Sequence, residues 1–224
     1  MQLIINHLTR MQKGFFCAAG IDISSGLHVR PILETGLRTE LLHREGGLFD
    51  LGATLDFGPM RFVGRTPELE DRIFDIANLR VVEAPNPAVL RDVCQRVARN
   101  ALTDIFSRDL EPWGTTFVVP ANQGLHSLGC LWVERPMLEF SCENDVSRVR
   151  LIWSEHGRPV AVGVADIRLY EADHRTLVAQ EVDRFQDILS RSDRILLSVG
   201  LSRPYRKSED EPAYHWLQIN NIHV

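Results

Sequence analysis

The sequence lacks any long apolar run. No stretch approaches the ~18 consecutive apolar residues of a membrane-spanning helix, and the amino terminus has no basic segment followed by an apolar signal core. Low-complexity tracts are also missing, and a hydrophobic content of 44% with 25% charged residues is typical of a chain that buries a core. We therefore expect a cytoplasmic globular protein with one large domain or two of about 100 residues each.

Cysteine and lysine are scarce. Lys13 and Lys207 are the only lysines among 25 cations, and the rest are arginines. The net charge of −5 excludes a protein whose whole surface attracts polyanions. Residues 1–80 carry ten acids against nine bases (−1), and the remainder carries twenty against sixteen (−4), so neither part is basic. No CxxC pair or zinc-type Cys-His spacing occurs, which predicts reduced, mostly buried thiols and no metal or cofactor at the four cysteines, Cys17, Cys94, Cys130 and Cys142.

Motifs of common enzymes are absent as well. The sequence has no Walker A loop, GxGxxG, GxSxG, HExxH or zinc-deaminase signature, and its histidines are dispersed. Asp71 and Asp75 share a helical spacing, which a polar helix face explains most simply. Asp166 lies in an apolar strand, where it is either a buried carboxylate with a perturbed pKa or, more commonly, a residue that faces solvent. We predict that the protein is not an enzyme.

The clearest local pattern is a β-hairpin between Met11 and Leu33. Residues 15–23 are apolar and partly alternating, Ser24-Ser25-Gly26 tolerates turn geometry, and an extended pattern resumes at Leu27. Pro31 confines the second strand to an edge or an end. Gly20 suits a bulge or bend of the kind that turns the corner of a small barrel.

The remaining chain consists mostly of short strand patterns around one strong helix. Asn86 caps and Pro87 begins an amphipathic helix that the apolar spacing extends to Ser107. A second helix is predicted over 175–190, with Asp173 or Thr176 as its cap, and a short helical segment over 34–45. Strands are predicted in the following segments: 2–8, one or two within 51–63, 78–83, 116–119, 127–133, 137–142, 148–154, 159–170, 194–201 and 214–222. Residues 66–71 are expected to form a polar turn and residues 155–158 a hairpin turn.

This order of elements predicts a mainly β (α+β) fold with two tandem small β-barrels. Strand–helix alternation of the doubly wound kind does not occur. The expected divisions are a first barrel over 1–85, a connecting helix over 86–110, and a second barrel with its own helix over 111–224.

Several short motifs resemble those of the dual OB-fold family. Arg10 and Lys13 precede the first hairpin strand as in the opening signature of that family, and the remaining motifs are CAAGID (17–22), HVRP (28–31), LSVGLS (197–202) and YHWLQI (214–219). The family is found in bacteria, often in gene neighbourhoods of anti-phage or genome-conflict systems. The resemblance implies two OB barrels and contact with nucleic acid, because OB barrels generally stack bases on aromatic side chains and hold the backbone with cations. His28 stands where the family pattern leads us to expect an aromatic residue.

Two groups of cations and aromatics are candidate nucleic-acid contacts. The first surrounds the hairpin and contains Arg10, Lys13, Phe15 and Arg30, and the second precedes and enters the last strand and contains Arg203, Tyr205, Arg206, Lys207, His215 and Trp216. Each group has a structural alternative. Phe15 is alternatively a core residue, Arg30 alternatively pairs with Asp22 across the hairpin, and residues 208–211 alternatively neutralise the basic loop.

We therefore predict a non-enzymatic, cytoplasmic protein that binds nucleic acid, in single-stranded form, as a possible subunit of a prokaryotic defence complex. The alternative is a protein-interaction subunit that docks a larger effector enzyme without touching nucleic acid. Steep salt dependence of binding distinguishes the first hypothesis from the second. On the first hypothesis, exchanging Arg203, Arg206 and Lys207 for alanine lowers the affinity for a single-stranded oligonucleotide.

Overall fold

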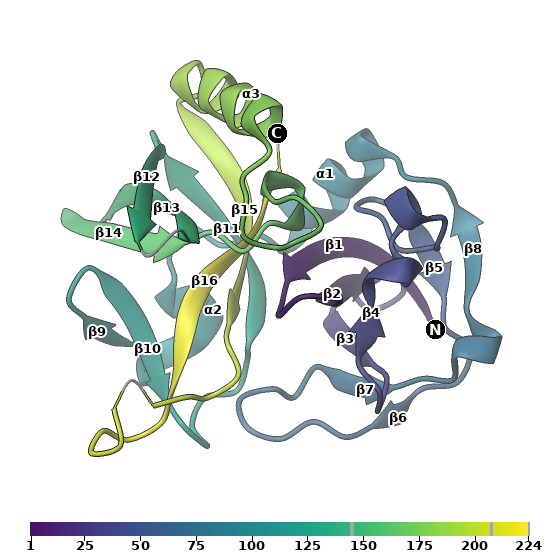
Figure 1. Ribbon diagram of the computed structural model, residues 1–224. Helices are drawn as coiled ribbons and strands as arrows, with labels where there is room; N and C mark the ends of the chain where they lie inside the picture. Colours follow the sequence, from purple (N-terminus) through teal and green to yellow (C-terminus); the bar gives the residue numbers. More distant parts are fainter. Residues whose placement is uncertain (144–145, 207, 224) are drawn as a thin grey trace.

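The computed structural model describes residues 1–143, 146–206 and 208–223. These residues form a mainly β structure whose strands belong to three sheets. Figure 1 shows two halves side by side: curled strands from β1 to β8 make up the amino-terminal half, and β9 to β16 make up the carboxy-terminal half. The predicted fold class, mainly β with two curled sheet systems and few helices, is confirmed.

The first half contains one sheet in the order β6-β7-β3-β2-β1-β5-β8, with β4 beside β2. Its strands are β1 (Gln2–Arg10), β2 (Phe15–Asp22), β3 (His28–Ile32), β4 (Leu37–Arg38), β5 (Thr54–Asp56), β6 (Arg61–Phe62), β7 (Asp71–Ile73) and β8 (Arg80–Glu83). Three 3₁₀ turns connect them: η1 (Thr39–Leu41), η2 (His43–Glu45) and η3 (Ile76–Asn78). The expected helical segment over 34–45 is therefore wrong in part, because Leu37 and Arg38 form β4, which pairs with β2.

The predicted hairpin is present, and the bulge lies opposite Gly20 in the neighbouring strand β1, not in the hairpin itself. β2 and β3 pair antiparallel, with Gly20 opposite Val29. On its other side β2 pairs with β1, whose register shifts between Ile5 and His7, so that Asn6 is an extra residue opposite Gly20. A Cβ atom at Gly20 would lie 2.8 Å from the Ile4 carbonyl oxygen, so only glycine lets β1 approach this closely.

The second half contains two sheets. The larger has the order β11-β15-β16-β10-β9 and the smaller the order β12-β13-β14. The strands are β9 (Glu111–Trp113), β10 (Thr116–Pro120), β11 (Leu128–Glu134), β12 (Met137–Glu143), β13 (Val146–Glu155), β14 (Arg158–Gly163), β15 (Arg194–Leu201) and β16 (Tyr214–His223). His156 and Gly157 both have positive φ, which gives the predicted two-residue hairpin turn between β13 and β14.

The helices are shorter than the sequence predicts. They are α1 (Pro87–Val97), α2 (Thr103–Phe106) and α3 (Ala179–Ser190), with 3₁₀ turns η4 (Ser107–Asp109) and η5 (Ile167–Leu169). Asn86 caps α1 as expected, accepting hydrogen bonds from the amides of Ala88 and Val89. The helix does not continue to Ser107, because the backbone of Arg99 pairs with β11 instead.

Two further predictions about segment ends are wrong. The predicted cap Asp173 binds the backbone of a turn before α3, and the residue that precedes α3 is Val178, which makes no capping contact. The strand predicted over 159–170 ends at Gly163, and Asp166 caps η5, its side chain accepting from the Arg168 amide. The expected turn over 66–71 contains a cis peptide bond before Pro67 and leads into β7, a strand that the sequence did not indicate. Asp71 and Asp75 therefore do not share a helix face.

Strand β1 is buried along nearly its whole length, because it serves both halves. Leu3, Ile5 and Leu8 belong to the core of the first half, while Ile4 packs in a small cluster with α1 and β11 residues. At its end, Asn221 of β16 accepts from the Leu8 amide (2.7 Å) and donates to the Leu8 carbonyl (3.1 Å). The two halves are thus joined by strand-like hydrogen bonds between β1 and β16.

The hydrophobic cores follow the two halves. One core extends from Leu3 to Leu79 and includes Ile167, and the larger one extends from Leu102 to Ile222. The boundaries expected at 85/86 and 110/111 stay a prediction. None of the helices in the described ranges is long and apolar enough to cross a membrane.

Candidate functional site

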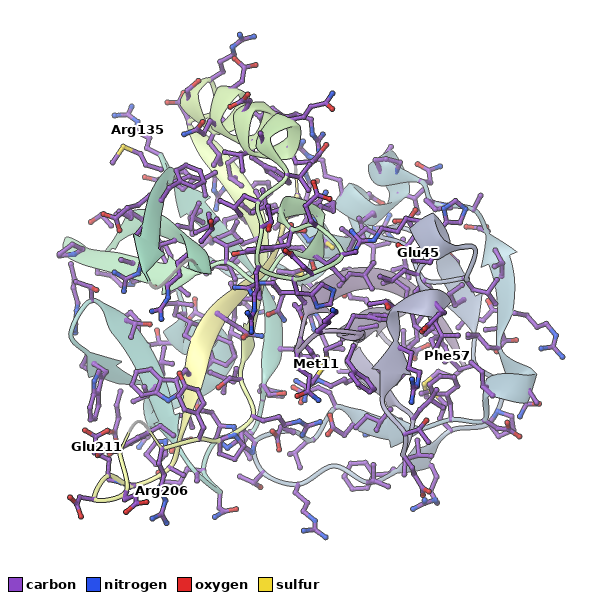
Figure 2. The ribbon with its side chains drawn as sticks, viewed as in Figure 1. Met11, Glu45, Phe57, Arg135, Arg206 and Glu211 are labelled. Carbon is purple, nitrogen blue, oxygen red and sulfur yellow. The ribbon has the colours of Figure 1, made fainter. Side chains whose placement is uncertain are left out.

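The structure has two adjoining cavities. One lies where the two halves meet, and the other lies between strands of the two sheets of the second half. The junction cavity, of about 610 Å³, is lined by β1 to β3 of the first half and by β15, β16 and their connecting loop in the second. The sheet cavity, of about 600 Å³, is lined by residues of β10, β13, β14 and β16. They share four lining residues, which are Arg10, Ser202, Tyr205 and Gln218. In Figure 2, Met11 of the junction cavity lies in the middle of the view, between the two halves.

Arg10 is the last residue of β1 and lies between the two cavities. Its backbone amide donates to the Ala165 carbonyl (2.9 Å), which fixes the residue against the second half. Its guanidinium lies 3.9 Å above the Tyr170 ring and donates to the His174 carbonyl (2.6 Å). No carboxylate of the described residues lies within ion-pair distance of Arg10, so it brings a positive charge to both cavities.

Arg30 and Arg203 share one buried carboxylate, that of Asp71. Arg30 is 5% exposed and donates to Asp71 Oδ1 (3.0 Å) and to the Ser127 hydroxyl (2.7 Å). Arg203 comes from the second half and pairs with Asp71 Oδ2 (2.8 Å) and Glu68 Oε1 (2.9 Å), yet 53% of its side chain is exposed. Arg203 therefore clamps the halves together and still presents charge at the junction cavity.

The alternative pairing of Arg30 with Asp22 is wrong. The Asp22 carboxylate accepts hydrogen bonds from the hydroxyls of Ser24 (2.8 Å) and Ser25 (2.6 Å) and thereby fixes the hairpin turn. The true partner lies 41 positions away along the chain. Arg30 is a structural cation in the wall of the junction cavity.

Tyr205 supplies the exposed aromatic face of the site. It is 48% exposed, and its backbone exchanges two hydrogen bonds of 3.1 Å with Tyr214 of β16. Its ring stacks on Trp216 with a centroid distance of 5.6 Å and an interplanar angle of 27°. Trp216 is only 7% exposed and is also packed by Trp113. The sequence suggested both Tyr205 and Trp216 as stacking residues. In the structure the exposed ring is that of Tyr205, and Trp216 supports it from behind.

Arg148 and Arg150 were not identified from the sequence as candidate contacts. Both line the sheet cavity, Arg148 as an exposed residue and Arg150 as a half-buried one. A usable signal was present, because residues two apart in a strand point to the same face. In the pattern Arg148-Val149-Arg150-Leu151, both apolar residues are buried in the core of the second half, which puts the two arginines on the opposite face.

Several predicted contacts lie outside the cavities. Lys13 is exposed in the turn between β1 and β2, and Phe15 is half-buried under Arg38 (5.5 Å), so neither the core nor the binding interpretation describes it fully. His215 is buried and contacts the Ser202 carbonyl (2.9 Å). Arg206 lies at the far end of the loop before β16 (Figure 2). Lys207 lies outside the described residues.

The acidic segment after the basic loop does not neutralise Arg206 in the described residues. The guanidinium of Arg206 contacts only the backbone carbonyl of Glu209, at 3.5 Å. The carboxylates that face the basic loop are instead Glu68 and Asp71 of the first half, which pair with Arg203.

Asp166 is a buried carboxylate, so the solvent-facing interpretation is wrong. It is fully buried and accepts hydrogen bonds from the Ile222 amide (3.1 Å) and from the guanidinium of Arg168 (2.6 Å). Burial alone lowers the pKa of Arg168, but the charge and hydrogen bonds of Asp166 outweigh this effect and raise it. The pair links η5 to β16 and does not line either cavity.

A buried polar cluster with two cysteines joins the halves near α1. The Asn6 amide donates to Ser198 Oγ (3.2 Å) and to Cys130 Sγ (3.4 Å), and His223 Nε2 lies 2.7 Å from Ser198 Oγ. Burial lowers the pKa of His223 to about 4, so its imidazole is neutral near pH 7. Within the described ranges, no group of three or more histidine, cysteine or carboxylate side chains is arranged to hold a metal ion. This cluster acts as a hydrogen-bonded seam.

The comparison with curated proteins finds no match. The model of one protein family, described as the dual OB-containing domain, matches residues 1–222, which is nearly the entire chain. Because the match covers both halves, the tandem OB-type architecture predicted from the sequence is confirmed along with the resemblance that suggested it. The chain belongs to the dual OB-containing domain family.

Proposed function

We propose that the protein binds single-stranded nucleic acid, without catalysis, along the two adjoining cavities. The supporting observation is the composition of their walls. Five arginines line them, whereas among the described residues no aspartate or glutamate does; the five are Arg10, Arg30, Arg148, Arg150 and Arg203. Arg30 is already paired with Asp71, so Arg10, Arg150 and the half-exposed Arg203 are the cations that favour an anionic ligand in this chain of net charge −5.

The half-exposed Tyr205 favours a nucleic acid over other polyanions. A base that stacks on an aromatic side chain gains about 1–3 kcal/mol, and stacking requires an unpaired base whose face is accessible. Tyr205 lines both cavities and has Trp216 behind it, so its outer face is held ready for a base while arginines on either side hold phosphates. This arrangement favours a single strand over a duplex, in which the bases are already stacked.

The test is a fluorescence anisotropy titration with a labelled single strand of roughly 16 nucleotides, the upper site size of one OB fold. R10A and R150A each remove one cationic side chain from the walls, and R206A removes the same side chain outside them. Each lost phosphate contact reduces the slope of log affinity against log salt by about 0.7. We expect this reduction in R10A and R150A but not in R206A.

Exchanging Tyr205 tests the stacking contact separately. Y205A should weaken binding by about 5- to 150-fold, which corresponds to 1–3 kcal/mol, while Y205F keeps the ring and the affinity. Melting temperatures of the free variants control for unfolding. Equal slopes for R10A, R150A and R206A, or equal affinities for Y205A and wild type, contradict the proposal.

The second candidate function is docking to a larger effector enzyme. Strand β8 favours it, because this strand is at the edge of the first sheet as described and exposes Val81 (48%) and Val82 (45%), and an edge strand can pair with a strand of another protein. Binding at β8 is expected to tolerate salt and to be lost in V81K/V82K, with no effect of R150A. A place in a bacterial defence complex, in the cytoplasm, stays a proposal that rests on the family resemblance alone.

A further inference from the structure

Three buried nitrogen atoms of the junction cavity have no hydrogen-bond partner among the residues that the structure describes. They are Nε2 of His7, Nε of Arg10 and Nε of Arg30. An unpaired buried donor costs about 1–3 kcal/mol, so a site that gathers three of them is built for something that accepts hydrogen bonds. The two Arg Nε atoms carry protons at all ordinary pH values, and the proton of His7 follows from its neighbours.

A chain of amides fixes the tautomer of His7. Gln218 Nε2 donates to Asn220 Oδ1 (2.9 Å), which turns Asn220 Nδ2 toward His7 Nδ1 (2.9 Å). Gly200 makes room for this amide, since a Cβ there would lie 2.4 Å from Asn220 Nδ2. An amide nitrogen only donates, so His7 Nδ1 accepts and the proton of a neutral imidazole is on Nε2.

The imidazole of His7 is neutral for two reasons. It is 1% exposed, and burial together with the neighbouring His28 lowers its pKa well below the ordinary value. His28 faces it edge-on, with a centroid distance of 5.4 Å. The charges of His223 and of Arg30 in the cavity wall also disfavour a second proton. His7 therefore offers one fixed N–H donor.

The rest of the wall has the chemistry that a nucleotide requires. The cavity volume of about 610 Å³ lies within the range of roughly 300–1,000 Å³ typical of small-ligand sites. Apolar side chains such as Phe16, Leu37 and Leu201 make up much of the lining, and the half-exposed Arg203 and Tyr205 belong to the same wall. A nucleotide combines a base, which has flat faces and acceptor atoms at its edge, with a phosphate attached to its sugar.

We propose that the junction cavity holds one nucleotide unit, with an acceptor atom of the base edge bonded to His7 Nε2 and the phosphate against Arg10 and Arg203. This inference rests on the proposed function, because it assigns one position of the bound strand to a pocket while the neighbouring units follow the sheet cavity. The same chemistry also fits a free mononucleotide, and the experiment separates the two sources.

The test combines His7 variants with a scan of base-free positions. H7F removes the donor and keeps a ring, whereas H7Q keeps an N–H near the position of Nε2. Each is titrated with single strands in which one nucleotide at a time is abasic. In wild type one position should cost more affinity than the others, and H7F should bind the intact strand about 2- to 12-fold more weakly, the factor of one net hydrogen bond. H7F should lose less than wild type when that base is removed, and H7Q should respond as wild type does.

The possible failures point to different errors. Two results contradict the pocket assignment while the proposed function stands, provided that strands bind with steep salt dependence. In the first, every abasic position lowers the affinity by the same factor. In the second, H7F and wild type lose the same affinity at every abasic position. If no strand binds, the proposed function is wrong. Calorimetry with AMP, CMP, GMP and UMP then tests whether the junction cavity holds a free mononucleotide. Binding heat that H7F abolishes and H7Q retains supports a free nucleotide as the ligand. The absence of such heat contradicts the assignment of the cavity as a nucleotide pocket. If H7F does not fold, the wild-type scan and H7Q carry the test.

Discussion

Exchanging Asp71 for asparagine tests the clamp on which the geometry of both cavities depends. Asp71 begins β7, is 5% exposed, and receives Arg30 on one oxygen and Arg203 on the other. D71N keeps the size of the side chain but removes its charge, and its amide nitrogen faces a guanidinium as a second donor. The amide oxygen can accept from only one of the two arginines, so Arg30 stays buried without its ion-pair partner, and its neutral partners are the Ser127 hydroxyl and, in one orientation, that oxygen.

The expected loss in the free energy of unfolding is about 3–5 kcal/mol, because removing one partner of a buried ion pair leaves an uncompensated charge. Arg203 adds little to this figure, since its side chain is 53% exposed and it keeps Glu68. For comparison, a domain has a total stability of about 5–15 kcal/mol. The prediction is thus a loss of about a fifth or more of the stability from the replacement of one carboxylate oxygen by an amide nitrogen.

Urea unfolding followed by tryptophan fluorescence measures the effect. With a slope near 3 kcal/mol/M, the midpoint of D71N should fall by at least about 1 M. R203A is the matched control and should lose about 1 kcal/mol or less, because it removes only the exposed partner. R30M/D71L, which replaces the whole pair by apolar side chains, should recover most of the loss. A D71N midpoint within about 0.3 M of wild type at an unchanged slope refutes the assignment of Asp71 as the necessary counter-charge of Arg30.

Two further predictions concern stability. Burial lowers the pKa of His223 from 6.5 to about 4, so between these pH values the unfolded chain binds a proton that the folded chain does not. The contribution of the neutral His223 to the free energy of unfolding should therefore be fully present above pH 6.5. It should fall by roughly 3 kcal/mol as the pH drops toward 4. Urea midpoints across this range check it, and a constant wild-type midpoint would falsify it. H223Q should reduce the response and leave the part that comes from His7, whose pKa burial also lowers. G20A should lower the free energy of unfolding by about 1–3 kcal/mol, because its Cβ would lie 2.8 Å from both the Ile4 oxygen and Leu3 Cβ. G163A is the control, since a Cβ there meets nothing within 4 Å. Equal melting temperatures of the two variants contradict the close approach of β1.

The start of α1 and the hairpin turns were predicted well from the sequence, because neighbouring residues determine them. Asn86-Pro87 begins α1, and the turn after Asp22 joins the first hairpin, because caps and turns depend on neighbouring residues. The end of α1 is different. Arg99 donates its amide to the Cys130 carbonyl and accepts from the Trp132 amide (both 2.9 Å), so a pairing with a strand 30 residues later overrides the apolar periodicity that continues to Ser107.

The candidate site was predictable in the same partial sense. Arg10, Arg203 and Tyr205 were identified from cations beside aromatics, and the fold brings these two distant groups to one junction. The sequence gives no sign that Arg30 is already occupied, since Asp71 reaches it through the parallel pairing of β3 with β7. Nor does composition reveal His7, whose donor is defined by Asn220 and Gln218 at the other end of the chain.

The distribution of acids explains how an acidic protein can present a positive groove. Glu68 and Asp71 are buried (9% and 5% exposed) behind the arginines, so their charges hold the cations in place without lining the cavities. The two carboxylates belong to the first half and Arg203 to the second, so the pairing that fixes the position of Arg203 also fixes the halves relative to each other. A groove already held in shape does not have to be ordered when a ligand arrives, which removes part of the entropic cost of binding. On the proposed function, the buried acids contribute to affinity through the rigidity of the junction, and their removal should weaken binding of the single strand even though it makes the local charge more positive.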